Sequence, residues 1–240
     1  MSKLDGQTVV VIGGSAGMGL ETARLARAEG AEVVITGRNP DRLKEAAADV
    51  DAVRTAAFDA TDAVQLQGFF SDFPGQIDHV FVTAGGPYYG LLADLDLEDA
   101  RQHIGMELTL PLYIGRAAIG KVRGSLTFIG GTGARQVAPG LIITSAMTNA
   151  QPSLIAGLAL ELAPIRVNLI AAGFVDTPLS ARLLGDDLEK RRQQLRDTLP
   201  IGRVVGPVDV AALAVHLMTN TALTGATYDI DGGQQFVPKG

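Results

Sequence analysis

The sequence of 240 residues contains no cysteine and no tryptophan. Without cysteine, the chain can form neither a disulfide framework nor a thiolate metal site. Long hydrophobic runs are also missing, because charged residues interrupt the longest apolar stretches, at Arg116 in one and at Glu161 in another. No stretch therefore predicts a membrane span. Residues 1–6 lack the apolar core of a signal peptide, so we expect a cytoplasmic protein.

Charge of one sign is not concentrated anywhere in the chain. The 20 Lys and Arg residues and the 26 Asp and Glu residues are scattered and give a formal net charge of -6. Proteins that bind nucleic acid usually gather their basic residues in a patch or stripe. We therefore expect no nucleic-acid partner, and an anionic cofactor would have to be bound by local backbone geometry. No grouping of His, Asp and Glu has the spacing of metal ligands, so no metal site is predicted.

What the chain does have is a β-branched run, residues 9–12, that breaks into a glycine-rich segment, residues 13–19. The run does not alternate apolar with polar residues, which is typical of a strand buried on both faces. A helix is predicted to follow from Gly17 to Ala28. Glycines in this position allow a tight turn and the close approach of a pyrophosphate, while the helix N-terminus offers free N–H groups. A tight strand-to-helix connection that binds nothing is the alternative.

Strands and helices are expected to alternate along the rest of the chain. Strands are predicted near residues 32–36, 53–58, 79–82, 125–129, 166–170 and 226–230. Helices are predicted over 63–71, 97–121 and 208–218, an apolar helix is expected to be centred on 153–162, and the charged segment 179–198 is expected to form a helical flap. The alternation predicts an α/β fold, a Rossmann-type doubly wound parallel sheet in a single domain spanning residues 1–240. A ligand crevice should lie beyond the carboxyl ends of the strands.

Several separate segments, in order, resemble the short-chain dehydrogenase/reductase family. Residues 12–19 fit its TGxxxGxG turn with Ile12 in place of Thr, residues 82–85 fit NNAG without the asparagines, and residues 172–177 are similar to PGxxxT. The segment 231–233 resembles the family's closing segment. The resemblance implies a nicotinamide dinucleotide as cofactor. The residues expected to bind it are Gly13, Ser15, Gly17, Met18, Gly19, Arg38, Asn39, Asp59, Ala60, Ala84, Gly85, Gly173, Val175 and Thr177.

The end of the second predicted strand favours NADP(H) over NAD(H). Enzymes that use NAD usually place a carboxylate there for the ribose hydroxyls. Here Gly37 occupies that place and Arg38 follows it. A guanidinium suits a 2′-phosphate, and the missing acid removes a repulsion. The alternative is that Arg38 is merely solvated, or pairs with Asp41 or Glu45.

The catalytic positions depart from the family pattern. The family uses a Tyr and a Lys spaced as YxxxK, aided by a Ser and an Asn. Alignment on the neighbouring segments places Thr144 over the Tyr, Thr148 over the Lys, Gly131 over the Ser and Glu107 over the Asn. None of the four tyrosines, at positions 88, 89, 113 and 228, has a lysine at the required spacing. The resemblance therefore implies a degenerate catalytic tetrad.

The chemistry that remains is hydride transfer to a substrate that needs no activated phenol, such as an imine or iminium. Thr144 cannot act as an acid at neutral pH, but its hydroxyl could position a substrate. Glu107 could stabilise an iminium, and it lies one helical turn from His103, so the two can interact. Thr144 and Glu107 are accordingly the predicted catalytic residues. The alternative for Glu107 is an ordinary helix-surface or core pair with His103.

Three functions remain open from the sequence. The first is an oxidoreductase with a non-standard proton donor, the second a dinucleotide-binding regulatory protein without turnover, and the third a lyase or isomerase that does no redox chemistry. A small-molecule substrate is expected, but the sequence does not identify it. The apolar helices around residues 108–114 and 154–162 predict a homo-oligomer, a dimer or a tetramer, and the resemblance implies tetramers. Burial of these helices within a monomer is the alternative.

Overall fold

The computed structural model describes residues 2–237 and contains one seven-stranded sheet. Every registered strand pair is parallel, and the strand order is β3-β2-β1-β4-β5-β6-β7. The strands are β1 (Thr8–Ile12), β2 (Glu32–Gly37), β3 (Arg54–Ala57), β4 (Ile77–Val82), β5 (Val122–Gly131), β6 (Arg166–Ala172) and β7 (Thr227–Ile230). The order reverses direction between β1 and β4, which is the topological switch point of a doubly wound sheet. The predicted fold class is confirmed.

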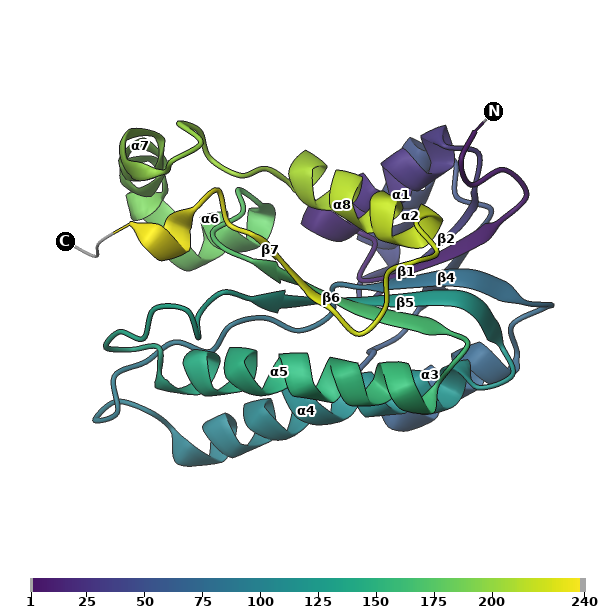
Figure 1. Cartoon of the computed structure of the whole chain (residues 1–240), viewed down its shortest axis with the longest axis horizontal. Coiled ribbons are helices and arrows are strands. Elements are labelled where there is room, and N and C mark those ends of the chain that lie inside the picture. Colours follow the sequence, from purple (N-terminus) through teal and green to yellow (C-terminus); the bar gives the residue numbers. More distant parts are fainter. Residues whose placement is uncertain (1, 238–240) are drawn as a thin grey trace.

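Helices cover both faces of this sheet (Figure 1). One face carries α1 (Gly17–Ala28), α2 (Pro40–Val50) and α8 (Pro207–Thr219). The other face carries α3 (Ala63–Ser71), α4 (Leu97–Ala118) and α5 (Ile142–Glu161). The segment predicted to be a flap forms α6 (Pro178–Leu184), a short 3-10 turn (Gly185–Asp187) and α7 (Leu188–Thr198). A second 3-10 turn spans Gln234–Phe236.

The apolar run of β1 does not alternate with polar residues because both faces of the strand are buried. Val10 and Ile12 face the core beneath α3, α4 and α5, whereas Val9 and Val11 face the core beneath α1, α2 and α8. All four side chains are fully buried. A strand that is covered on both faces needs apolar side chains at every position, and β1 supplies them.

Some predicted boundaries were wrong. The helix predicted over 97–121 ends at Ala118, because Gly120 adopts a positive φ of 75° and begins a turn. The apolar helix expected to be centred on residues 153–162 spans Ile142 to Glu161, so it extends further toward the N-terminus than toward the C-terminus of that centre. Helix α2 was not predicted, although Asn39 and Pro40 provide a helix start: the Asn39 side chain accepts the backbone N–H of Arg42 at 2.9 Å.

Within residues 2–237, no helix is long and apolar enough to cross a membrane. The cytoplasmic location expected from the sequence stays a prediction.

Candidate active site

The glycine-rich segment after β1 forms a turn that leaves no room for side chains. The backbone N–H groups of Gly13 and Gly14 both donate to the carbonyl of Thr36 on β2, at 3.2 and 2.9 Å. Gly13 has a φ of 93°, and a Cβ on Gly19 would overlap the carbonyl oxygen of Gly13. The Thr83 hydroxyl donates to that same carbonyl at 3.0 Å. Hydrogen bonds to Thr36 on β2 and from Thr83, just after β4, therefore hold the turn in place, directly before the N-terminus of α1.

The end of β2 lies against the glycine turn. A Cβ on Gly37 would lie 3.1 Å from the Ser15 hydroxyl oxygen, so the two turns are in close contact. Arg38 follows Gly37 at the surface, and it makes no ion pair or hydrogen bond with another described residue. The alternative pairing of Arg38 with Asp41 or Glu45 is thus not formed.

Asp59, which the resemblance implies as a cofactor-binding residue, lies just beyond the end of β3. Its Oδ1 accepts the backbone N–H and the hydroxyl of Thr61, at 2.9 and 2.8 Å. Ala60 is buried in the core. Asp59 and Ala60 therefore lie at the edge of the sheet formed by the carboxyl ends of the strands, where the turn at Gly13 also lies.

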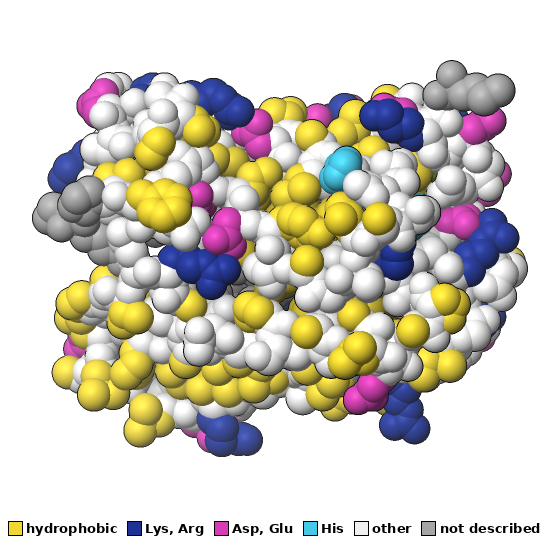
Figure 2. Space-filling model, viewed as in Figure 1, with side chains coloured by type: hydrophobic (Ala, Val, Ile, Leu, Met, Phe, Trp, Pro, Cys, Tyr) yellow, Lys and Arg dark blue, Asp and Glu magenta, His cyan; other side chains and the backbone are white. Residues whose placement is uncertain are grey.

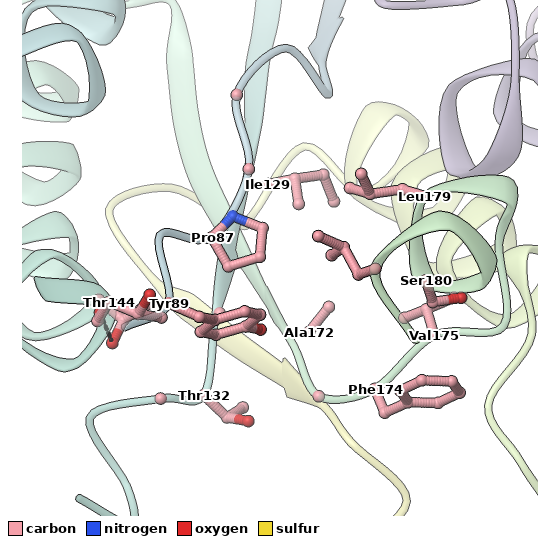
Figure 3. Close-up of a pocket in the computed structure, with 18 of the residues that line it drawn as sticks. Pro87, Tyr89, Ile129, Thr132, Thr144, Ala172, Phe174, Val175, Leu179 and Ser180 are labelled. Carbon is pink, nitrogen blue, oxygen red and sulfur yellow. Dashed lines mark hydrogen bonds between the residues drawn. The ribbon is translucent and has the colours of Figure 1, made fainter. Parts of the chain in front are cut away.

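A cavity of about 510 Å³ opens at the carboxyl ends of β1, β4, β5 and β6. Figure 3 shows its walls, with the rings of Tyr89 and Phe174 on opposite sides. The predicted site residues that line it are Met18, Ala84, Gly85, Glu107, Gly131, Thr144, Thr148, Gly173, Val175 and Thr177. The predicted cofactor residues that do not line it are Gly13, Ser15, Gly17, Gly19, Arg38, Asn39, Asp59 and Ala60. A Cβ on Gly17 would lie 3.4 Å from Thr177, so the glycine turn adjoins the cavity wall.

Of the described residues that line this cavity, Glu107 is the only one with a carboxylate. Its side chain is 14% exposed. Oε1 accepts the N–H of Gly86, and Oε2 accepts from Nε2 of Gln151, each at 3.2 Å. Burial raises the pKa of Glu107, and the N–H of Gly86 partly offsets the effect. The predicted contact with His103 is present, with Nε2 4.0 Å from Oε1 of Glu107, but burial lowers the pKa of His103, which favours a neutral ring.

The three small residues at the other tetrad positions pack against one another. A Cβ on Gly131 would lie 3.2 Å from Cγ2 of Thr148, and one on Gly133 would lie 3.1 Å from Cγ2 of Thr144. The Thr148 hydroxyl donates to the carbonyl of Thr144, at 2.8 Å. Both threonine hydroxyls therefore have partners within the chain, since that of Thr144 bonds the backbone of Tyr88.

The loop after β4 carries two tyrosines, of which only Tyr89 lines the cavity. The ring of Tyr88 lies over that of His103, with centroids 5.1 Å apart, and its hydroxyl donates to the carbonyl of Asp96 at 3.3 Å. The Tyr89 side chain lines the cavity instead, and burial raises its pKa. A phenol whose pKa is raised is a poorer proton donor at neutral pH than an ordinary one.

The opposite wall comes from the segment after β6 and from the flap. The N–H of Phe174 donates to Oε1 of Gln234 at 2.9 Å, and Thr177 caps α6. Asp176 binds Arg192 through two hydrogen bonds, at 2.8 and 2.9 Å, which ties α7 to the end of β6. The flap therefore forms a fixed part of the cavity wall.

Three residues that the sequence did not single out also belong to the site. Thr83 braces the glycine turn, Gln151 bonds Glu107, and Arg191 lines the cavity from α7. Gln151 could have been found by periodicity, because it follows Thr144 and Thr148 at helical spacing. Arg191 could not, since it is one of several arginines in a charged helix. Among residues 2–237, no group of three or more His, Asp and Glu side chains could hold a metal ion.

A parallel sheet with a glycine-locked turn at the N-terminus of α1 and a cavity at the switch point defines a dinucleotide-binding α/β protein. The family profile described as enoyl-(acyl carrier protein) reductase matches residues 13–235. The chain belongs to the short-chain dehydrogenase/reductase family, whose members bind nicotinamide dinucleotides.

Relatives by sequence and solved structures of similar fold both cover nearly the whole chain. The short-chain dehydrogenase/reductase malC of Malbranchea aurantiaca is 27% identical over 253 aligned residues, which cover 96% of this chain and 95% of that protein. The solved MalC reductase/Diels-Alderase superposes with a TM-score of 0.90 at 26% identity, covering 98% of each chain. A NADP-dependent (R)-specific alcohol dehydrogenase of Lentilactobacillus kefiri is 28% identical, covering 96% of this chain and 97% of that one.

Proposed function

We propose that the protein is an NADP(H)-dependent oxidoreductase that reduces a C=N bond, an imine or an iminium. The observation that carries the proposal is Glu107: in the part of the chain that the structure describes, it is the one carboxylate lining the cavity, and no lysine lines it. A carboxylate suits a substrate whose positive charge must be stabilised, whereas reduction of a ketone by the family's usual route needs a tyrosine activated by a lysine. The proposal thus follows from which charged groups line the cavity.

The proposed preference for NADP(H) rests on Arg38. This guanidinium stands beside Gly37 at the end of β2, is exposed, and has no partner among the described residues. No acid occupies the position after β2 that would repel a 2′-phosphate. The NADP dependence named for the Lentilactobacillus kefiri relative is in keeping with this preference.

The chain's own residues would divide the work as follows. A bound reduced nicotinamide supplies hydride. For a neutral imine, Glu107 in its protonated form would give its proton to the nitrogen as the carbon accepts hydride, which balances the reduction to an amine. For an iminium, the ionised Glu107 would stabilise the positive charge. Thr144 would position the loop of Tyr88 and Tyr89 against the substrate through its bonds to the Tyr88 backbone.

A second candidate is non-redox catalysis in the same cavity, a lyase or isomerase reaction. The name of the Malbranchea aurantiaca structure joins a reductase activity with a Diels-Alderase activity in one protein of this fold. The occupied hydroxyls of Thr144 and Thr148 also leave open the third candidate, a regulatory protein that binds the dinucleotide without turnover.

The deciding experiment begins with a fluorescence titration of NADPH and NADH, which is clean because the chain has no tryptophan. Tighter binding of NADPH supports the cofactor proposal, and failure to bind either dinucleotide would refute it. A panel of cyclic imines, N-alkyl iminium salts, ketones and enones is then offered with NADPH. Reduction of C=N substrates but not of ketones is expected. Conversion of a substrate without oxidation of NADPH would favour the second candidate.

We also propose that the protein assembles as a homo-oligomer, a dimer or a tetramer, through α4 and α5. Leu112 and Tyr113 on α4 are 46% and 42% exposed, and Leu160 on α5 is 83% exposed. Figure 2 shows hydrophobic side chains along the surface over these helices. Light scattering tests this assembly, and a 25.0 kDa species would refute it.

A further inference from the structure

Among residues 2–237, Arg191 on α7 is the only arginine or lysine that lines the cavity. Its guanidinium lies 6.0 Å from the ring centroid of Phe174, and burial lowers its pKa. The positive charge of Arg191 in turn lowers the pKa of Tyr89, against the larger effect of burial. The guanidinium therefore stands close to both aromatic walls of the cavity.

No carboxylate of the described residues pairs with Arg191. Its one hydrogen bond runs from Nη1 to Oε1 of Gln194, at 2.7 Å. The neighbouring arginines of the same helix behave differently, because Arg192 pairs with Asp176 and Glu189, and Arg196 pairs with Glu189. A partly buried guanidinium without an acid has lost hydration and has received no charge in return, so an anion at this place would be bound favourably.

The two charged groups of the cavity wall come from different elements. Glu107 belongs to α4, on the side covered by α3, α4 and α5, and Arg191 belongs to α7 of the flap. The same cavity is also lined by aromatic and aliphatic side chains, including Tyr89, Phe174 and Leu183. A molecule that fills this space would meet a negative charge at one place, an apolar wall, and a positive charge at another.

We propose that Arg191 binds a carboxylate of the substrate, so that the substrate class is an imine or iminium carrying a carboxylate on an apolar, aromatic-sized body. The proposal rests on the proposed function for the C=N group, whereas the carboxylate site rests on Arg191 itself. Arg191 is then the residue that decides specificity between acidic and neutral imines. The planar guanidinium can hold both carboxylate oxygens at once, which fixes the orientation of the far end of the substrate.

The test compares two probes that differ only in charge: 1-phenyl-3,4-dihydroisoquinoline and its 4-carboxyphenyl analogue. Binding of each to the protein–NADP⁺ complex is measured by calorimetry, where no hydride is available and turnover cannot interfere. The variants are Arg191→Met, which removes the guanidinium and keeps an unbranched apolar side chain, and Arg191→Lys, which keeps the positive charge. Arg196→Met on the same helix is the control, since Arg196 does not line the cavity.

Arg191→Met is expected to weaken binding of the carboxylate probe about tenfold and to leave the neutral probe within about twofold. Arg191→Lys should recover part of the loss, and Arg196→Met should bind both probes as the parent does. The inference is overturned if the parent does not bind the carboxylate probe, or if Arg191→Met weakens both probes equally. It is also overturned if Arg191→Met weakens NADP⁺, because Arg191 would then be a cofactor contact.

The same probes separate this inference from the proposed function. If the carboxylate probe binds through Arg191 but is not reduced with NADPH, and no other imine is reduced, the anion site stands and the proposed reduction fails. If both probes are reduced by the parent and by Arg191→Met at equal kcat/KM, the reduction stands and the anion site fails.

Discussion

The hydroxyl of Thr144 on α5 holds the backbone of Tyr88 twice: Oγ1 donates to its carbonyl at 2.8 Å and accepts its N–H at 3.1 Å. Both groups of one residue in an irregular loop are thus satisfied by a single side chain. The N–H of Gly86, two residues earlier, is bound by Glu107 on α4. The two predicted catalytic residues therefore anchor the same loop, the one that carries Tyr89 into the cavity.

We therefore predict that Thr144→Val increases the mobility of the loop around Tyr88 more than it lowers the stability of the fold. Val has nearly the same shape but offers neither a donor nor an acceptor, so the Tyr88 peptide loses both partners, at a cost of about 1–3 kcal/mol. Hydrogen exchange at the Tyr88 amide should accelerate, and KM for an imine should rise more than kcat falls. Thr144→Ser should keep both bonds.

Thr109→Val on α4 is the matched control, because the Thr109 hydroxyl bonds only the carbonyl of Gly105 in its own helix. A large fall in kcat for Thr144→Val with unchanged exchange at Tyr88 would show that the hydroxyl takes part in the reaction instead.

Glu107→Gln should separate the two kinds of C=N substrate. Burial raises the pKa of Glu107, so a protonated form persists above the usual range of a glutamate. With a neutral imine, the rate should fall as pH rises through that raised pKa, and Glu107→Gln should lower kcat about 100-fold. With a permanently charged N-methyl iminium, no proton is needed, and the variant should raise KM because the compensating charge is gone.

Stability should respond to pH in the same sense as this rate. Because the folded state binds the Glu107 proton more tightly than the unfolded chain, this group stabilises the fold at low pH, and its contribution is lost as pH rises through the raised pKa. In urea unfolding, the free energy of unfolding of Glu107→Gln should not show this fall with rising pH. Glu98→Gln, on the exposed side of α4, controls for removal of a negative charge. If Glu107→Gln reduces both substrates as the parent does, Glu107 only holds Gly86 and Gln151.

The fold could be predicted because its causes are local and repeated. The run at Val9 to Ile12 is apolar throughout since it faces two cores, and the glycine turn is required by contacts as close as that of Gly19 with the carbonyl of Gly13. Boundaries were less certain, as the early start of α5 at Ile142 shows. No capping side chain marks that start, because Leu141 precedes it.

The site could be predicted only where its residues follow strands. Ala84, Gly173 and Val175 come directly after buried strands and line the cavity as expected. Tyr88 and Gly86, whose backbones bind Thr144 and Glu107, lie in an irregular loop. The path of this loop depends on those tertiary contacts, which the sequence does not reveal. Arg191 stands out only when its neighbours' ion pairs are known, and ion pairs across elements have no signature in the sequence.

Arg38→Ala should discriminate between the dinucleotides. The guanidinium is free to meet a 2′-phosphate and has no structural partner to lose, so stability should stay unchanged. NADPH should bind about tenfold more weakly, and NADH as before, since a charge-assisted contact to one phosphate is removed. Fluorescence titration measures both. Lys44→Ala, on the exposed face of α2, is the control, and unchanged NADPH affinity in Arg38→Ala would end the phosphate role.

The last prediction concerns His79, which is buried in β4. Nδ1 lies 2.8 Å from the Ser125 hydroxyl, and Nε2 lies 2.7 Å from Oε1 of Gln7. Since that amide oxygen only accepts, Nε2 donates and Nδ1 accepts the hydroxyl proton of Ser125, so the neutral ring is satisfied. Burial, aided by the positive charge of Arg166, lowers the pKa of His79 from 6.5 to about 4.

Between those two values the unfolded chain binds a proton at this position and the folded chain does not. Stability should therefore fall as pH drops from 6.5 to about 4, by about 3 kcal/mol from this residue. Urea unfolding across this range should give a shallower slope for His79→Gln than for the parent. His216→Gln, exposed on α8, should leave the slope as it is. Equal slopes for His79→Gln and the parent would mean that the folded protein accepts the proton, and that Ser125 turns its hydroxyl to receive it.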